Sequence, residues 1–169
     1  FDAALLSVQQ GKADIVMAGV TVTDERKAVM DFSDSYATGI QSVIVPEGSD
    51  IASPDDLAGK KIGTQRGTTG YSYCIDDYGE DSVVPFDDGA TAVQNLLAGK
   101  VDCVVIDKAP AQEYVKANAG LTILDTEYAN EDYAIGMAKG NTALLDAVNG
   151  ALKELMEDGT IQSIIDKYI

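Results

Sequence analysis

The chain has no histidine and no tryptophan, and only two cysteines among its 169 residues. Without histidine, the sequence excludes a serine–histidine–aspartate triad and a histidine/cysteine zinc site. The acidic pairs at 76–77, 80–81 and 87–88 lack the alternating spacing of a calcium loop, so we interpret them as solvated faces. We therefore expect no metal and no cofactor.

Basic residues are also scarce. Lys and Arg number 12 against 28 Asp and Glu, so the formal net charge is −16. Such a charge repels phosphate backbones, which predicts no nucleic-acid partner and leaves cationic or zwitterionic small molecules as ligands. Apolar runs are short as well, far below the roughly 18 residues that a membrane-spanning helix needs.

What is present is a regular alternation of short apolar runs with amphipathic stretches, which predicts an α/β fold with mainly parallel sheets. Strands are expected at 14–18, 39–46, 61–64, 82–86, 101–107, 121–124 and 133–138. Helices are expected at 2–10, after Thr23, from Ser53, from 70 to 78, and at 88–98, 110–116, 142–157 and 161–168.

The first candidate site follows the strand at 14–18. The chain breaks at Gly19 and restarts as a helix, with Thr23 as N-cap and two acids in the first turn, where the helix dipole favours them. Arg26 is a cation in that turn. Just beyond a strand end, an arginine and backbone N–H groups are suited to hold an anion, so we expect this turn to bind a carboxylate. The alternative is a surface salt bridge with Asp24 or Asp34.

Two further loops leave the predicted carboxyl ends of strands, where open α/β sheets bind ligands. Thr68 and Thr69 offer hydroxyls and N–H groups at a helix start, although they could simply cap that helix. Asp107 ends an apolar strand, where a carboxylate needs a partner such as a ligand ammonium, unless it caps the helix near Pro110. Together with Thr21 and Arg26, these groups match the head group of an α-amino acid, its carboxylate and its ammonium.

Five segments carry a resemblance to a known family. Residues 11–26 (GKADIVMAGVTVTDER) and 30–36 (MDFSDSY) resemble the signature of the family 3 extracellular solute-binding proteins, the polar amino-acid receptors of ABC importers. Residues 63–69 (GTQRGTT), 101–107 (VDCVVID) and 149–160 (NGALKELMEDGT) are similar to later motifs of the same family. The resemblance covers the whole chain, and the first motif is the most specific because its glycine, threonines and arginine all fall in register.

The resemblance implies a role for each candidate residue. Arg26 would pair with the ligand carboxylate, helped by the N–H groups of Thr21 and Thr69 beside Thr68. Asp107 would take the ammonium, together with the Gly19 carbonyl and the Thr21 hydroxyl. It also implies a type II periplasmic-binding-protein fold, in which lobe 1 (1–45 and 128–169) and lobe 2 (48–125) close on the ligand about crossings near 39–47 and 126–133.

The resemblance further implies an extracytoplasmic protein, either periplasmic or lipid-anchored on the outer face of the cell membrane, that serves a membrane permease. The chain opens without a signal peptide, and the family has a further strand, helix and strand before the point that matches Phe1. We therefore expect a fragment or processed product with an incomplete lobe 1, whose exposed edge is covered by self-association.

Some alternatives stay open at this point. A cyclohexadienyl-dehydratase-like enzyme and a sensory domain of a larger receptor use the same fold. Arg66 could be a second cation of the site or a surface ion pair, and Tyr36 could pack near the crossing strands rather than contact a ligand. Cys74 and Cys103 could be free core thiols or, because export permits it, a disulfide.

Overall fold

The computed structural model describes residues 1–168, which divide into two compact units. The central unit comprises Phe1 and 40–130, and the terminal unit comprises 2–39 and 131–168. The chain passes between the units in β3 (Ala37–Pro46) and again in β8 (Ala129–Tyr133), and these two strands pair with each other. No helix in the described part of the chain has the length and apolarity needed to cross a bilayer.

The central unit is built on a sheet in the order β5-β4-β6-β3-β7. Its further strands are β4 (Ile62–Gln65), β5 (Val83–Phe86), β6 (Cys103–Asp107) and β7 (Leu121–Ile123). Strand β4 runs parallel to β5 and β6, whereas β3 joins β6 and β7 antiparallel. Pro85 lies in the edge strand β5, a position that tolerates its missing N–H.

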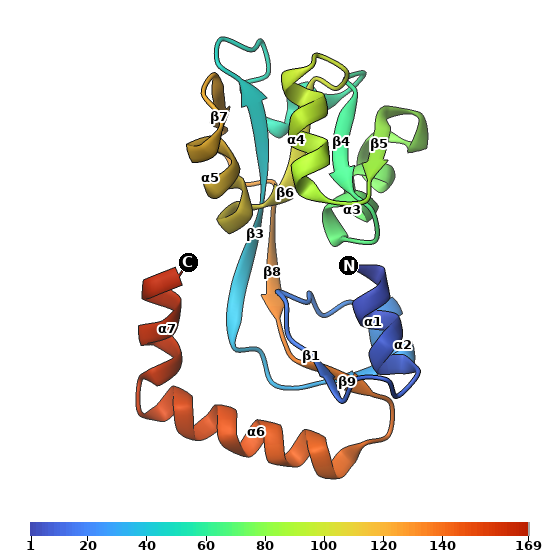
Figure 1. Ribbon diagram of the computed structural model, residues 1–169, viewed down its shortest axis with the longest axis vertical. Helices are drawn as coiled ribbons and strands as arrows, with labels where there is room; N and C mark the ends of the chain where they lie inside the picture. Colours follow the sequence, from blue (N-terminus) through green and yellow to red (C-terminus); the bar gives the residue numbers. More distant parts are fainter. Residues whose placement is uncertain (169) are drawn as a thin grey trace. The chain divides into compact units, whose positions relative to one another are not determined.

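Helices cover both faces of this sheet (Figure 1). Alternate residues of β3 and β6 point to opposite faces, and α3 (Thr69–Tyr78) packs on the face with Val43 and Val105. Helices α4 (Gly89–Leu97) and α5 (Lys108–Ala117) pack on the face with Ile44 and Val104. Two short 3-10 turns, η1 (Pro54–Leu57) and η2 (Glu80–Ser82), complete the unit. The predicted α/β class is thereby confirmed.

The terminal unit contains a three-stranded antiparallel sheet in the order β1-β9-β2. Its strands are β1 (Ile15–Val16), β2 (Met30–Phe32) and β9 (Gly136–Ala138). The helices are α1 (Asp2–Gln9), α2 (Asp24–Val29), α6 (Thr142–Glu157) and α7 (Thr160–Tyr168). Lys139 pairs with Asp31 across β9 and β2 at 2.9 Å, and this ion pair lowers the pKa of Asp31.

Several expected elements have different bounds. The strand expected at 14–18 is only two residues long, and Ile15 and Met17, on either side of the buried Val16, are exposed, so one face of this segment is not covered. The strand expected at 133–138 is interrupted, since β8 ends at Tyr133 and β9 begins at Gly136. The helix expected from Ser53 is the single turn η1, and β2 has no counterpart among the predicted strands.

The two cysteines are free thiols in the core of the central unit, Cys74 on α3 and Cys103 on β6. Burial raises the pKa of Cys74 to about 12, and burial also raises the pKa of Cys103. The thiolate is the reactive form of cysteine, so both thiols are chemically inert in the folded protein at neutral pH. Of the two alternatives that the sequence left open, the structure shows the free thiols.

We therefore expect iodoacetamide at pH 8 to leave the folded protein unmodified for hours and to add to both cysteines once the chain is denatured without reductant. Unfolding removes the burial that raises the two pKa values, so the thiolate fraction returns to that of an ordinary cysteine. Mass spectrometry of the intact chain counts the adducts. A denatured chain that takes up the reagent only after reduction would contradict the free thiols.

Candidate functional site

The first cluster of candidate residues, which we call the terminal cluster, comprises Gly19, Thr21 and Arg26 in the terminal unit. The predicted N-cap is confirmed, because the Thr23 hydroxyl accepts a hydrogen bond from the Arg26 N–H at 3.2 Å. Helix α2 has only six residues, so Arg26 lies in its last turn as well as near its start. A cation is favourable at that end of a helix, which removes the conflict with the helix dipole.

The backbone on either side of Thr21 pairs with the chain at 132–134. Ala134 N–H donates to the Val20 carbonyl at 3.1 Å, and Val22 N–H donates to the Asp132 carbonyl at 3.1 Å. In an extended segment, the N–H and carbonyl of one residue point to one edge, and those of the next residue point to the opposite edge. The N–H and carbonyl of Thr21 therefore point away from the segment at 132–134. There the Thr21 carbonyl accepts a hydrogen bond from Arg26 Nη1 at 2.8 Å. The guanidinium is thus held at the edge to which the Thr21 N–H points.

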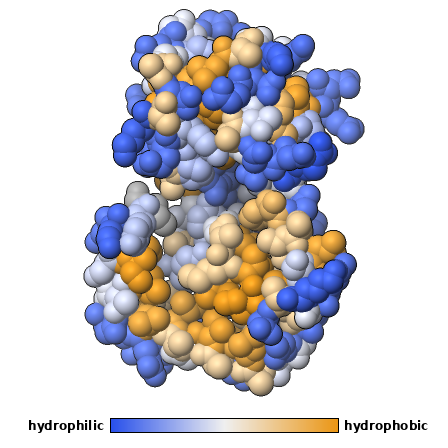
Figure 2. Space-filling model, in the orientation of Figure 1, coloured by the Kyte–Doolittle hydropathy of each residue, from blue (hydrophilic) through white to orange (hydrophobic). Residues whose placement is uncertain are grey.

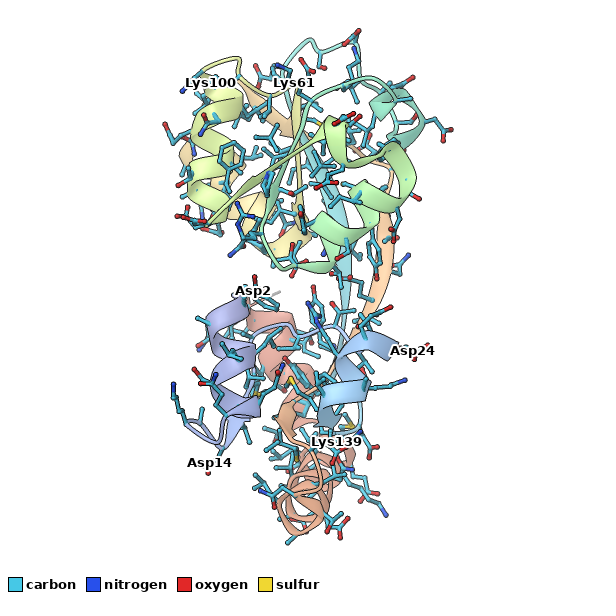
Figure 3. The ribbon with its side chains drawn as sticks, turned by 90° about the vertical axis from the view of Figure 1, so that its right-hand side faces the viewer. Asp2, Asp14, Asp24, Lys61, Lys100 and Lys139 are labelled. Atoms are coloured by element: carbon cyan, nitrogen blue, oxygen red, sulfur yellow. The ribbon has the colours of Figure 1, made fainter. Side chains whose placement is uncertain are left out.

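Other side chains shape this cluster. Asp24 points outward from α2, as Figure 3 shows, and lies 3.7 Å from Lys27 rather than facing the strand. The Glu25 pKa is lowered, chiefly by a hydrogen bond from its own backbone N–H and by the Thr23 side chain. Burial raises the pKa of Tyr36, and a hydrogen bond with the Gly19 backbone partly offsets that effect. Tyr36 therefore belongs to the cluster and is neutral at physiological pH.

The second cluster, the central cluster, comprises Thr68, Thr69 and Asp107 in the central unit. Thr68 is the N-cap of α3, accepting a hydrogen bond from Tyr71 N–H at 3.4 Å and donating one to the Gln65 carbonyl at 2.8 Å. Thr69 is the first residue of the helix and is buried. The N–H groups of a first helical turn point out of the helix end, where they favour an anion.

Asp107 is the last residue of β6 and occupies the N-cap position of α5, yet its side chain makes no capping hydrogen bond. Its Oδ1 instead accepts a hydrogen bond from Gln41 Nε2 of the neighbouring strand β3. The carboxylate is therefore oriented by a side chain of the sheet and not by the helix that it precedes. The arrangement disfavours the simple capping role and leaves Asp107 as an oriented anion in this cluster.

The remaining candidates have ordinary surface roles. Arg66 lies 3.8 Å from Asp87, and with side chains 53% and 94% exposed this ion pair adds little stability. Asp88 caps α4, and the hydrogen bond from Thr91 N–H at 2.7 Å lowers its pKa. Asp77 accepts a hydrogen bond from the Tyr128 hydroxyl at 2.6 Å. Across residues 1–168, no three acidic or cysteine side chains converge as metal ligands.

Two side-chain contacts at these clusters could not be predicted from the sequence. Gln41 lies between Ile40 and Ser42 in a strand rich in β-branched residues, and its amide was given no role of its own. Tyr36 was left open between packing and ligand contact, and nothing local to it indicates its hydrogen bond with Gly19, seventeen positions earlier. Each contact depends on a pairing between distant segments, which the local pattern does not encode.

Comparison with known proteins gives one consistent result. The family model of the bacterial extracellular solute-binding proteins, family 3, matches residues 1–169. The L-cystine-binding protein TcyJ of Escherichia coli K12 is 34% identical over 172 residues, which cover 99% of this chain and 64% of that protein. The chain thus spans less than two thirds of the length of this curated relative.

Comparison with solved structures gives the same result. The arginine-, lysine-, histidine-binding protein ArtJ from Geobacillus stearothermophilus superposes with a TM-score of 0.92 at 35% identity, covering 100% of this chain and 75% of that one. An ancestral arginine-binding protein bound to glutamine gives a TM-score of 0.93 at 41% identity, covering 100% and 76%. The fold is therefore of the type II periplasmic-binding-protein class that the sequence predicted.

Proposed function

We propose that this chain, which belongs to the bacterial extracellular solute-binding proteins of family 3, binds a polar or basic α-amino acid for delivery to an ABC importer. The observation that carries the proposal is the pair of oppositely charged clusters. Arg26 is held beside the Thr21 backbone in the terminal unit, and Asp107 is held by Gln41 in the central unit. An α-amino acid carries the two complementary charges on groups attached to the same carbon atom.

In the proposed mode of binding, Arg26 pairs with the ligand carboxylate, and the N–H groups of Thr21 and Thr69 complete the anion site. Asp107 receives the ammonium, with the Gly19 carbonyl and the Thr21 hydroxyl as further acceptors, and Thr68 keeps the α3 terminus in place. The two units correspond in this proposal to the two lobes, with β3 and β8 as the hinge. A ligand that contacts both lobes favours the closed state only to the extent that it makes contacts there that the open state lacks.

The ligand class rests on chemistry and on the relatives together. The net charge of −16 favours a cationic or neutral amino acid over an acidic one. Similar proteins are named for binding cystine in one case and arginine, lysine and histidine in another. We propose that a membrane permease recognises the closed, ligand-bound form. The site of action would be extracytoplasmic, in the periplasm or at the outer face of the cell membrane through a lipid anchor.

The enzymatic alternative is a dehydratase of the cyclohexadienyl type on the same fold. Such an enzyme keeps the carboxylate-binding arginine but needs a general acid in place of a group that recognises an amine. Asp107 is oriented as a hydrogen-bond acceptor by the Gln41 amide, which suits recognition of a ligand ammonium. We therefore propose a binding protein and expect no turnover of prephenate or arogenate. A sensory domain of a larger receptor would bind the same ligand.

A thermal-shift screen of the twenty amino acids tests the function. A ligand that binds only the folded state raises the midpoint of unfolding with its concentration. We expect polar or basic L-amino acids to raise the midpoint and acidic ones to leave it unchanged. A chain that responds to none of the twenty at millimolar concentration would refute the proposed function.

We also propose that the terminal unit self-associates with a second copy. Apolar side chains gather on this unit, as Figure 2 shows, and its exposed large residues are Leu6, Ile15, Met17, Val29, Leu155, Met156, Ile164 and Tyr168. A hollow of about 460 Å³ lies beside α6 with Leu152 and Met156 in its lining. The edge strand β1 adds backbone groups that a second copy could pair with.

Self-association is expected to increase with salt, because the charge of −16 on each copy opposes it and salt screens that repulsion. Light scattering coupled to size-exclusion chromatography measures the mass at low and high ionic strength. Ile164→Glu should shift the equilibrium to monomer. The matched control is Leu97→Glu, which changes a similarly exposed leucine of the central unit and should have no effect. A monomer at high concentration in both salt conditions would contradict the proposal.

A further inference from the structure

Gln41 is a buried amide at the point where its strand, β3, enters the core. Gln41 is 1% exposed, the neighbouring Ser42 is 3% exposed, and the apolar residues Val43, Ile44 and Val45 that follow are each at most 2% exposed. Burying an amide is unfavourable unless both of its ends are accommodated by polar or close-fitting surroundings. A glutamine at this position therefore calls for an explanation in terms of what its amide contacts.

The nitrogen end of the amide contacts Asp107. Gln41 and Asp107 face each other in the antiparallel register of β3 and β6, and Gln41 Nε2 donates a hydrogen bond to Asp107 Oδ1. Directly opposed residues of such a pair have side chains close together on one face of the sheet. The backbone of Gln41 is also fixed, because its carbonyl accepts a hydrogen bond from Tyr128 N–H at 2.9 Å. The donor is thus fixed relative to the strand that carries Asp107.

The oxygen end of the amide lies against the first turn of α3. A Cβ atom placed on Gly70 would be 2.6 Å from Gln41 Oε1, so a side chain at position 70 would displace the amide. Gly70 directly follows Thr69, the first residue of the helix. Gln41 therefore lies between the carboxylate of the central cluster and the helix terminus of the same cluster.

We propose that Gln41 is a positioning residue that sets the preference of the site for ligands with an α-amino group. This inference depends on the proposed function. By holding the Asp107 carboxylate in one orientation relative to the α3 terminus, Gln41 prepares the anion for an ammonium before any ligand arrives. Preorganisation of this kind raises affinity by removing the cost of ordering the side chain on binding.

The test compares L-arginine with 5-guanidinopentanoate, which is the same molecule without its α-amino group. Calorimetry, with competition for weak binders, gives both dissociation constants for the wild type and for Gln41→Met, an apolar replacement of similar length. We expect Gln41→Met to weaken L-arginine binding by about tenfold or more, the size expected for a hydrogen bond to a charged group. Binding of 5-guanidinopentanoate should change by about twofold or less, because that ligand leaves Asp107 unused.

A second variant tests the same contact from the other end. Gly70→Ala displaces the amide through its oxygen while keeping Gln41 itself, and it should weaken L-arginine binding selectively as well. In an Asp107→Ala background, Gln41→Met should have no further effect on either ligand.

The possible outcomes separate the two proposals. Equal weakening of both ligands, or no weakening of either, would overturn the positioning role and leave the proposed function intact. A wild-type chain that binds L-arginine no more tightly than 5-guanidinopentanoate would instead contradict amine recognition by the proposed site. If Gln41→Met does not fold, Gly70→Ala decides between the outcomes by the same two dissociation constants.

Discussion

Replacing Arg26 with alanine is expected to abolish amino-acid binding, with a loss of affinity of about 100-fold or more. The substitution removes the cation that the Thr21 carbonyl holds at 2.8 Å and leaves the ligand carboxylate without its charged partner. Truncating one member of a hydrogen-bonded charge pair in a desolvated site costs about 2–5 kcal/mol. Calorimetric titration with L-arginine measures the loss.

The control for this prediction is Lys27→Ala on the same short helix. Lys27 is the neighbouring cation, its side chain is 58% exposed, and it pairs with Asp24 at the surface. An exposed pair of this type is worth little, so both folding and binding should be retained. A loss of less than about tenfold in Arg26→Ala, or an equal loss in Lys27→Ala, would overturn the role given to Arg26.

Replacing Asp107 with alanine is expected to weaken L-arginine binding by about 100-fold, for the complementary reason that the ammonium loses its anion. The variant should fold, because the Asp107 side chain does not cap α5 and the residue lies at the end of its strand. Affinity for 5-guanidinopentanoate should stay close to that of the wild type. The same two titrations used for Gln41 provide the measurement.

Asp125→Ala is the matched control, because Asp125 is an exposed acid of the same unit outside both clusters. It changes the net charge by the same amount as Asp107→Ala and should leave both affinities unchanged. A comparable loss in the two variants would mean that the overall charge, and not the Asp107 carboxylate, determines affinity. Strong binding of L-arginine by Asp107→Ala would refute the role of this residue outright.

Much of the fold could be predicted from local chemistry. Thr23 and Thr68 are N-caps as their side chains predicted, and the apolar run ending at Asp107 is a central strand. These features depend on hydrogen bonds and apolar contacts within a few residues, which the sequence displays directly. The position of Asp107 at the end of β6 and that of Arg26 in the short helix capped by Thr23 follow from the same local pattern.

The features that could not be predicted depend on pairing between distant segments. The short strand β2 forms because Met30–Phe32 pairs with β9, more than a hundred residues away. The contact between Gln41 and Asp107 depends on the antiparallel register of β3 and β6, whereas a one-residue shift would point Gln41 to the other face. Neither pairing leaves a signature in the composition of a single segment. The candidate residues concern only an amino-acid head group, so the sequence predicted a ligand class and no single amino acid.

The most direct test of the central claim is a calorimetric titration of the unmodified chain with three related ligands. L-arginine has both charges of the head group, agmatine lacks the carboxylate, and 5-guanidinopentanoate lacks the ammonium. We predict binding of L-arginine at a ratio of one to one and a loss of about 100-fold or more for each analogue, because each removes the partner of one cluster. Agmatine or 5-guanidinopentanoate binding as tightly as L-arginine would contradict recognition of the head group by Arg26 and Asp107.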